Sequence, residues 1–240
     1  PHIKPLKKKS KNIIAEVWGS DFYRVNSKIK QKLQHVIYSA VDSIVFTNPK
    51  TQKQFIDSNA KIDPKKCHVA GFGLPVLDEI DKLNNMEAEY KDWCEKFSLP
   101  VDKLKVLVGY NANLAHNQIL AIDKIGKIRA DLLDSIHLVF PLGYGSKDSK
   151  EIILSELSEK GINNFTILGD FYNFEDTAKL RIITDILINI QPSDQFSGSM
   201  QETLYAGNTV IAGNWLPYEE IIDNGANIYP IITPDDVGDA

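Results

Sequence analysis

Short apolar runs alternate with amphipathic stretches along most of the chain. The runs at 105–109, 137–142 and 185–190 are mainly apolar and are bounded by loops containing glycine or polar residues. The stretches between them repeat apolar positions with a helical period. Strands that alternate with helices in this way predict parallel βαβ units with right-handed crossovers. Continuous apolar strands further indicate sheets that are covered by helices on both faces.

The second half of the chain carries this pattern most clearly, and residues 105–240 are expected to form one nearly complete doubly wound domain. The expected strands are 105–109, 137–142, 165–168, 185–190 and 209–212, and the expected helices are about 115–133, 148–160, 174–182, 198–206 and 217–223. The fold class predicted from this alternation is α/β, with Rossmann-type sheets.

The first half carries a shorter version of the same pattern, and residues 1–80 are expected to form a second Rossmann-like domain. Its expected strands are 12–18, 43–47 and 67–73, with helices at 28–41 and from about residue 51. Two or three βα units cannot bury both faces of a sheet, so this domain is expected to be incomplete and the native protein to begin earlier. Residues 81–104 are expected to form a charged helical linker between the domains.

The composition is that of a soluble globular protein. The 240 residues are 43% hydrophobic and 25% charged, with no apolar run long enough to cross a membrane and no signal peptide. The two cysteines form neither a disulfide framework nor a metal-ligand pattern, which favours a reducing cytoplasmic setting. No metal and no separate cofactor are expected.

The net charge of −5 conceals an uneven distribution. Residues 1–80 hold 14 Lys and Arg against 7 Asp and Glu, whereas residues 81–240 hold 13 against 25. The lysines at positions 4, 7, 8, 9 and 11 are consistent with a peripheral contact with an anionic membrane or with a phosphate-bearing acceptor. The alternative is a solvated, partly irregular segment. No nucleic-acid partner is expected.

The candidate binding residues follow the strands of the second domain, because ligands of open parallel sheets bind beyond the carboxyl ends of the strands. These loops are rich in Gly, Asn, Ser and aromatic residues. The candidates are Asn111, Asn113, Gly143, Tyr144, Gly145, Asp170, Phe171, Ser197, Gly198, Ser199 and Glu202.

The last of these loops is the most informative. Ser197, Gly198 and Ser199 open a helix, whose free N–H groups favour an anion such as a diphosphate. Glu202 lies one turn further on, where its carboxylate could accept bonds from ribose hydroxyls, and Asp194 could reach sugar hydroxyls. Ordinary helix capping by Ser197, with Glu202 solvated, is the alternative. No Gly-x-Gly-x-x-Gly follows the first strand, which argues against a dinucleotide site.

The segment from Pro192 to Ala212, with acidic residues eight apart at Asp194 and Glu202, resembles the nucleotide-sugar segment of group 1 glycosyltransferases of the GT-B fold. The stretches 108–119, 141–145 and 167–171 are also similar to the bacterial transferases that add 4-acetamido-4,6-dideoxygalactose to a lipid-linked acceptor. The resemblance implies a GT-B-like fold of two Rossmann-type doubly wound domains. It also implies that Asp194 contacts the donor sugar and Glu202 the ribose.

Three residues are catalytic candidates: Asp21, His116 and Asp194. Asp21 ends the strand at 12–18, where it could orient or deprotonate an acceptor hydroxyl, or simply cap the following turn. His116 lies in the loop where Tyr110 replaces an Arg usual in the family. It could stabilise the leaving diphosphate, or be structural.

These observations predict a hexosyltransferase-type glycosyltransferase of bacterial surface polysaccharide synthesis. Its donor would be a UDP- or TDP-linked sugar, and its acceptor a glycan or polyprenyl-linked glycan. Location would be cytoplasmic or peripheral on the inner face of the membrane. The alternatives are a nucleotide-sugar epimerase of the same fold and a non-catalytic two-domain sugar-binding module.

Overall fold

The computed structural model describes residues 3–84 and 86–240. Pro1 and His2 of the expected first domain, and Asn85 of the expected linker, lie outside the described residues. The chain divides into two compact units. The first comprises Pro1–Gly73 with Ser193–Phe196, and the second comprises Leu74–Pro192 with Ser197–Ala240.

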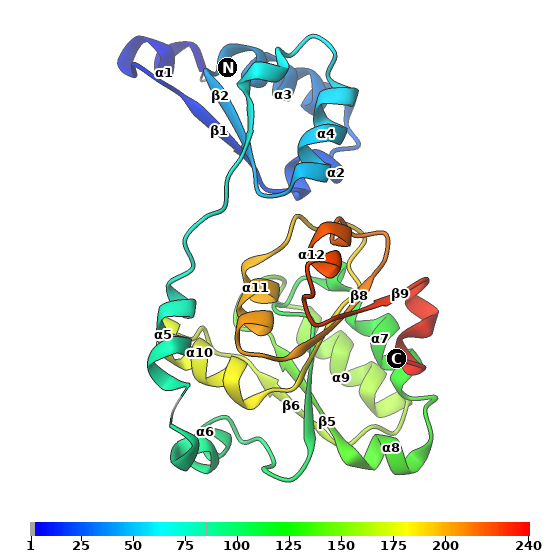
Figure 1. Cartoon of the computed structure of the whole chain (residues 1–240). Helices are drawn as coiled ribbons and strands as arrows, with labels where there is room; N and C mark the ends of the chain where they lie inside the picture. The colour runs from blue at the N-terminus through cyan, green and yellow to red at the C-terminus, as the bar shows by residue number, and fades with distance from the viewer. Residues whose placement is uncertain (1–2, 85) are drawn as a thin grey trace. The chain divides into compact units, whose positions relative to one another are not determined.

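The first unit contains a three-stranded parallel sheet in the order β1-β2-β3. Figure 1 shows its strands with α3 and α4 beside them. Its elements are α1 (Ile3–Lys9), β1 (Ile14–Val17), α2 (Ser20–Tyr23), α3 (Lys28–Ala40), β2 (Ser43–Phe46), α4 (Pro49–Ser58), η1 (Pro64–Lys66) and β3 (Cys67–Val69).

The core of this unit lies between the sheet and these helices. Tyr38 of α3 and Phe55 of α4 pack in one buried cluster with Ile44 and Phe46 of β2. The start of α4 is set locally by Asn48, whose side-chain oxygen accepts from the N–H groups of the next turn at 2.8 and 3.3 Å. Strand pairing and helix packing therefore follow the expected βαβ order.

The second unit contains a six-stranded, fully parallel sheet (Figure 1). Before its first strand come α5 (Pro75–Leu83), η2 (Glu87–Glu89) and α6 (Tyr90–Lys96). The remaining elements are β4 (Leu104–Val108), η3 (Leu114–His116), α7 (Gln118–Ile125), α8 (Ala130–Ser135), β5 (Ile136–Pro141), α9 (Ser149–Glu159), β6 (Phe165–Leu168), α10 (Phe174–Ile183), β7 (Ile186–Asn189), α11 (Gly198–Tyr205), β8 (Thr209–Gly213), α12 (Glu219–Asp223), β9 (Ile228–Ile231) and η4 (Pro234–Gly238).

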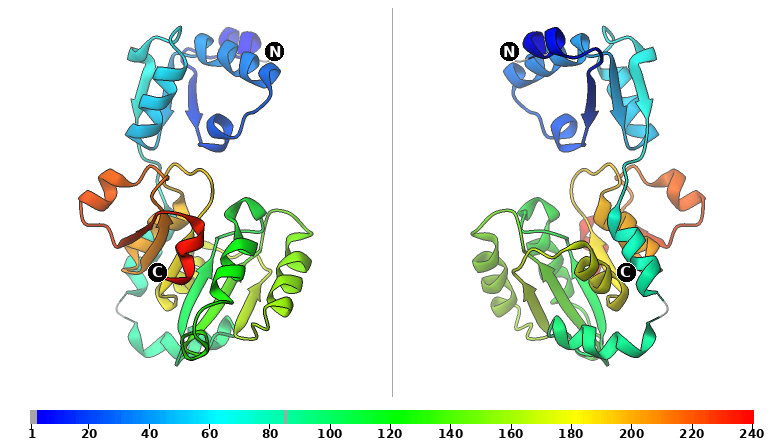
Figure 2. Two further views of the ribbon diagram at one scale, coloured as in Figure 1. Left: turned by 90° about the vertical axis from the view of Figure 1, so that its right-hand side faces the viewer. Right: turned by 90° about the vertical axis from the view of Figure 1, so that its left-hand side faces the viewer.

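The strand order in this sheet is β6-β5-β4-β7-β8-β9, so the order reverses between β4 and β7. This is the doubly wound arrangement, in which ligands bind at the carboxyl edge near the reversal. Helices α7 and α9 pack on one face of the sheet, and α10, with α5 and α11 against it, lies on the other (Figure 2). Both faces are covered, as the continuous apolar strands predict.

The expected long helix at 115–133 is wrong. The chain instead forms η3 and α7, separated by Asn117, and then α8 after a turn at 126–129. Asn117 takes a left-handed backbone conformation, with φ of 58°, and its side chain donates to the carbonyl of Ile190 at 2.8 Å. A hydrogen bond to a loop 73 residues away therefore fixes the start of α7, and the turn that begins at Gly126 ends it.

The expected linker at 81–104 differs from what is observed, because its helices belong to the second unit. Helix α5 begins already at Pro75, a residue suited to the first turn of a helix. It ends at Leu83, and α6 begins at Tyr90. Val76, Ile80 and Trp93 are buried, and α5 and α6 both contact α10. Burial of these side chains makes the segment part of a packed layer of the second unit.

Two further elements have no counterpart among the expected ones. Residues 3–9 form helix α1, not an irregular segment, and Ile3 is buried in the core of the first unit. Residues 228–231 form the edge strand β9. Within residues 3–84 and 86–240, no helix is both long and apolar enough to cross a membrane.

Candidate functional site

A cavity of ≈ 250 Å³ opens in the second unit beyond the carboxyl ends of β4, β5 and β6. Its walls come from the three loops that follow these strands and from α5, α10 and α11. The lining residues are Val76, Tyr110, Pro141, Gly143, Tyr144, Asp170, Phe171, Tyr172, Phe174, Thr177, Leu180, Arg181, Ser199 and Glu202. The cavity lies at the edge of the sheet to which the carboxyl-edge rule points, and we call it the carboxyl-edge cavity.

Two glycines hold the three loops together. A Cβ atom on Gly143 would lie 2.1 Å from the carbonyl oxygen of Asp170, so the backbones after β5 and β6 touch at this point. Gly145 has φ of +120° and a Cβ there would lie 2.8 Å from the carbonyl carbon of Ala112, with which it forms a β-bridge. Only glycine allows such close approach, so both predicted glycines bring these loops together, and Gly143 also lines the cavity.

A buried ion pair forms the opposite wall. Arg181 of α10 donates from Nε and Nη2 to Oε2 of Glu202 on α11, at 3.1 and 3.0 Å. Its Nη2 also donates to the hydroxyl of Ser199 at 2.8 Å. The side chains of Arg181 and Glu202 are only 5% and 10% exposed, so this hydrogen-bonded charge pair is buried. Glu202 is therefore not the solvated helix residue of the alternative interpretation.

Aromatic rings line the outer part of the cavity. Tyr144 and Phe171, both predicted, make an edge contact with ring centroids 6.1 Å apart and are 53% and 78% exposed. Tyr110 and Tyr172 also line the wall, and Tyr172 packs edge-on against Phe97 at 5.2 Å. Exposed rings at a cavity mouth offer flat apolar surfaces to a planar ligand group.

The loop after β4 packs against two tyrosines of the cavity wall. His116 is buried, and its Nε2 lies 3.1 Å from the side-chain oxygen of Asn111, while its ring packs edge-on against Tyr110 at 4.1 Å. Asn111 in turn donates to the hydroxyl of Tyr144 at 3.3 Å. Asn113 accepts from the N–H of Ala115 and thereby caps η3. His116 and Asn111 thus lie directly behind the tyrosines of the wall.

The N-terminus of α11 lies at the same wall. Ser197 is its N-cap residue by position, with an extended backbone, and its side chain makes no capping hydrogen bond. Gly198 and Ser199 begin the helix, and Ser199 lines the cavity. The first N–H groups of α11 are therefore close to the carboxyl-edge cavity.

The segment Ser193–Phe196, which contains Asp194, belongs to the first unit. Gln195 donates from Nε2 to the carbonyl of Val17 at 2.5 Å, and its own carbonyl accepts from the hydroxyl of Thr47 at 2.8 Å. Arg24 donates to both the hydroxyl and the carbonyl oxygen of Ser193. Asp194 is thus anchored on the first unit and Glu202 on the second.

Asp21 lies in the first turn of α2. Its Oδ1 accepts from the N–H of Trp18 at 2.9 Å, as a residue that caps a turn would do. Burial raises the pKa of Asp21, and the hydrogen bond from Trp18 partly opposes that effect. Burial and the negative charge of Asp21 together raise the pKa of Tyr38 to about 12. A raised pKa moves Asp21 toward the range that suits a general base.

The raised pKa of Asp21 has a consequence for stability. The folded state holds the Asp21 proton more tightly than the unfolded state, so this group destabilises the fold as pH rises from 3.8 through the raised value. Asp21→Asn keeps an acceptor for Trp18, and we expect it to lose less unfolding free energy than the parent over that range. Urea unfolding at several pH values would measure the difference. Asp57→Asn, at an exposed ion pair, is the control, and identical profiles for all three proteins would contradict the expectation.

Several residues of the site have no signal in the sequence. Arg181, Thr177 and Phe174 come from one helix and line the cavity only because α10 packs against α11. A lone arginine among the apolar residues of a helix is the one hint that was present. Across the described ranges, no three His, Cys, Asp or Glu side chains gather closely enough to hold a metal ion.

Sequence comparison matches the chain to no known protein family and to no curated protein. Comparison of structures does find similar proteins. A glycosyltransferase from Rickettsia africae is similar with a TM-score of 0.72 at 17% identity, over 94% of this chain and 58% of that protein. A UDP-forming trehalose-phosphate synthase from Burkholderia vietnamiensis gives a TM-score of 0.74 at 11% identity, over 100% and 62%. The Anabaena protein HepE, solved with UDP-glucose, gives 0.70 at 13%, over 95% and 61%.

The chain therefore spans about 60% of the length of these proteins. At such low identities the likeness concerns the fold, and it holds over almost all of this chain. The predicted α/β class with Rossmann-type parallel sheets is confirmed. The larger sheet has six strands, one more than expected, and the smaller has three. The chain has the GT-B-like fold of these glycosyltransferases.

Proposed function

We propose that this chain is the donor-binding part of a glycosyltransferase that moves a sugar from a nucleoside diphosphate to an acceptor. The observation that carries the proposal is the carboxyl-edge cavity, where the Arg181–Glu202 pair and the start of α11 face a wall of aromatic rings. This combination suits a ligand with a planar base, vicinal hydroxyls and a diphosphate. Similar structures that contain UDP and UDP-glucose support the assignment.

Each part of the ligand has a matching feature in the cavity. Both hydrogen bonds from Arg181 end on Oε2 of Glu202, which leaves Oε1 as the oxygen to accept from ribose hydroxyls. The N–H groups of Gly198 and Ser199 can bind the diphosphate, which the helix dipole also favours. Tyr144 and Phe171 offer faces on which a base can stack. A UDP-linked sugar meets all three requirements, whereas a TDP-linked sugar, with a deoxyribose, offers Glu202 only the 3′-hydroxyl.

Catalysis in this proposal depends on positioning and on stabilisation of the leaving diphosphate. Asp194 would contact the donor sugar, and Asp21 would orient or deprotonate the acceptor hydroxyl. His116 lies behind Tyr110 and is bonded to Asn111, so it would act on the diphosphate through these neighbours. The acceptor would be a glycan or polyprenyl-linked glycan of a bacterial surface polysaccharide, met at the cytoplasmic side of the membrane.

Calorimetric titration of the chain with UDP, TDP and GDP tests the donor site. We expect saturable binding of one of them, and binding about tenfold weaker or more in Glu202→Gln, because the hydroxyls of the ribose lose a charged acceptor. Gln can still accept a hydrogen bond from Arg181, but the guanidinium loses its buried counter-charge, so circular dichroism must show that the variant is folded.

The matched control is Glu151→Gln, which replaces an exposed glutamate of α9. Its affinity for the nucleotide should equal that of the parent. A folded parent chain that binds none of the three nucleotides would overturn the donor site, and the sugar-binding module would become the leading interpretation. Equal affinity in Glu202→Gln and the parent would remove Glu202 from the site.

A further inference from the structure

Helix α3 exposes a stripe of apolar side chains. Ile29, Leu33 and Val36 are 73%, 43% and 54% exposed. Their spacing of four and three residues places them on one face of the helix. Tyr38, on the opposite face, is buried in the core of the first unit. The helix therefore has two apolar faces, and only one of them is used by the core.

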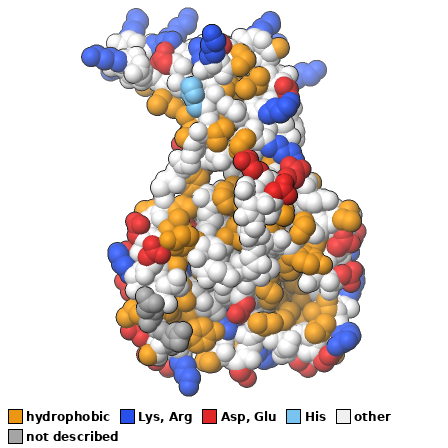
Figure 3. All heavy atoms as spheres, in the orientation of Figure 1, with side chains coloured by type: hydrophobic (Ala, Val, Ile, Leu, Met, Phe, Trp, Pro, Cys, Tyr) orange, Lys and Arg blue, Asp and Glu red, His pale blue; other side chains and the backbone are white. Residues whose placement is uncertain are grey.

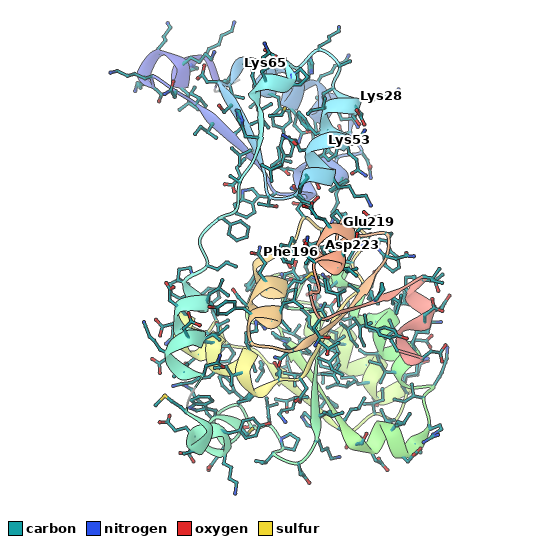
Figure 4. All side chains as sticks on the ribbon, viewed as in Figure 1. Lys28, Lys53, Lys65, Phe196, Glu219 and Asp223 are labelled. Atoms are coloured by element: carbon teal, nitrogen blue, oxygen red, sulfur yellow. The ribbon has the colours of Figure 1, made fainter. Side chains whose placement is uncertain are left out.

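Lysines flank this exposed stripe. Lys28, Lys30 and Lys32 lie in the first two turns of α3 and are all exposed. Helix α1 of the same unit adds four more exposed lysines and an exposed Leu6. Figure 3 shows Lys and Arg side chains gathered along the outer margin of the unit that contains α1. Figure 4 labels Lys28 at the edge of the same unit.

The first unit as a whole also carries an excess of positive charge. Its residues include 14 Lys and Arg against 6 Asp and Glu. An exposed apolar stripe that is bordered by lysines has the character of a helix that lies in the plane of a membrane interface. The apolar side chains enter the boundary of the acyl chains, and the lysine stems reach back so that their ammonium groups meet anionic headgroups.

We infer that this surface, termed the α3 face and made of Ile29, Leu33 and Val36 with Lys28, Lys30 and Lys32, docks on an anionic lipid bilayer. The inference deepens the peripheral location that belongs to the proposed function, and it names the residues responsible. It needs no nucleotide, so docking and donor binding can be tested separately. The mixture of apolar and cationic groups favours lipid over an uncharged partner, because each lysine near such a surface contributes to binding.

Co-sedimentation of the chain with lipid vesicles tests the inference. We expect binding to phosphatidylcholine vesicles that contain about 30 mol% phosphatidylglycerol, weaker binding at high salt, and little binding to phosphatidylcholine alone. Ile29→Asn, Leu33→Asn and Val36→Asn combined should weaken partitioning about tenfold or more. Lys28→Glu with Lys32→Glu should have an effect of similar size.

Two variants in the second unit serve as matched controls. Ile232 is 75% exposed and Lys150 is exposed, so Ile232→Asn and Lys150→Glu remove the same kinds of group from another surface. Both should bind vesicles as the parent does. Circular dichroism of the α3 variants shows whether they remain folded.

The outcomes separate the occupants of the α3 face. Equal binding to both kinds of vesicle, or equal loss in the α3 and control variants, would overturn the inference. Self-association through this face would also overturn the inference. In that case sedimentation velocity would show that the parent self-associates and the triple variant does not, while the triple variant binds vesicles as the parent does. The α3 face would then join two copies of the chain. Loss of nucleotide binding with vesicle binding retained would instead count against the donor site alone.

Discussion

Gly143→Ala is expected to destabilise the second unit by about 3 kcal/mol and to weaken nucleotide binding about tenfold. The added Cβ would lie 2.1 Å from the carbonyl oxygen of Asp170 and 2.7 Å from its carbonyl carbon. Both are backbone atoms, so no side-chain rotation relieves the contact. The loops after β5 and β6 must separate, and this displaces Asp170 and Phe171 in the cavity wall.

The matched control is Gly169→Ala, in the neighbouring loop. A Cβ atom there meets nothing within 4 Å, and the backbone is not in the left-handed region. This change should alter the free energy of unfolding by no more than about 0.5 kcal/mol. Urea unfolding followed by tryptophan fluorescence would measure both variants. Equal stabilities would mean that the two loops do not depend on their close approach.

Arg181→Met is expected to cost about 3–5 kcal/mol of unfolding free energy, because it leaves the carboxylate of Glu202 buried without its cation. Among the described residues that line the cavity, Arg181 is the one lysine or arginine. Combining Arg181→Met with Glu202→Leu removes both charges and should recover most of the loss. The double-mutant cycle should therefore give a coupling energy of about 2 kcal/mol or more.

An exposed pair provides the comparison. On α4, Nζ of Lys53 lies 2.7 Å from Oδ2 of Asp57, but the two side chains are 76% and 61% exposed. Lys53→Met should change stability by less than about 1 kcal/mol. If Arg181→Met cost no more than Lys53→Met, the Arg181–Glu202 pair would not be the buried, ordered element that its geometry indicates.

The same pair is central to both stability and ligand binding. In the double variant Arg181→Met with Glu202→Leu, the second unit should remain folded. Its cavity, however, should lose the carboxylate that is proposed to bind ribose. Nucleotide affinity should then remain low although stability recovers. A protein in which both recover would assign the pair to stability alone.

Much of the second unit could be predicted because its strands are buried on both faces. A strand in such a sheet must be a continuous apolar run, and the run at 165–168 matches β6 residue for residue. Helices between strands of this kind are amphipathic, so α9 at Ser149–Glu159 lies within one residue of expectation at either end. Where one local pattern sufficed, the prediction was accurate.

Errors occurred where distant contacts override local pattern. Asn117 interrupts the expected helix because its side chain reaches the carbonyl of Ile190. The expected linker is instead a packed layer of the second unit, because Trp93 and Ile80 are buried in helices that contact α10. Neither partner is a sequence neighbour, so periodicity cannot reveal these contacts.

Most of the order of strands and helices, and hence the loops at which a ligand site should form, could be derived from the sequence alone. Six of the candidates predicted in this way line the carboxyl-edge cavity: Gly143, Tyr144, Asp170, Phe171, Ser199 and Glu202. The rule works because parallel strands direct their carboxyl ends to one edge of a sheet.

The partners of these side chains depend on how the chain folds in three dimensions. The fold pairs Glu202 with Arg181, places His116 behind Tyr110, and assigns Asp194 to the first unit through the hydrogen bonds of its neighbour Gln195. It also leaves the apolar stripe of α3 exposed, where periodicity alone would bury it. The physical reason is the same throughout: burial and hydrogen bonding depend on which elements pack together, and the partners here lie between 5 and 178 residues apart in the chain.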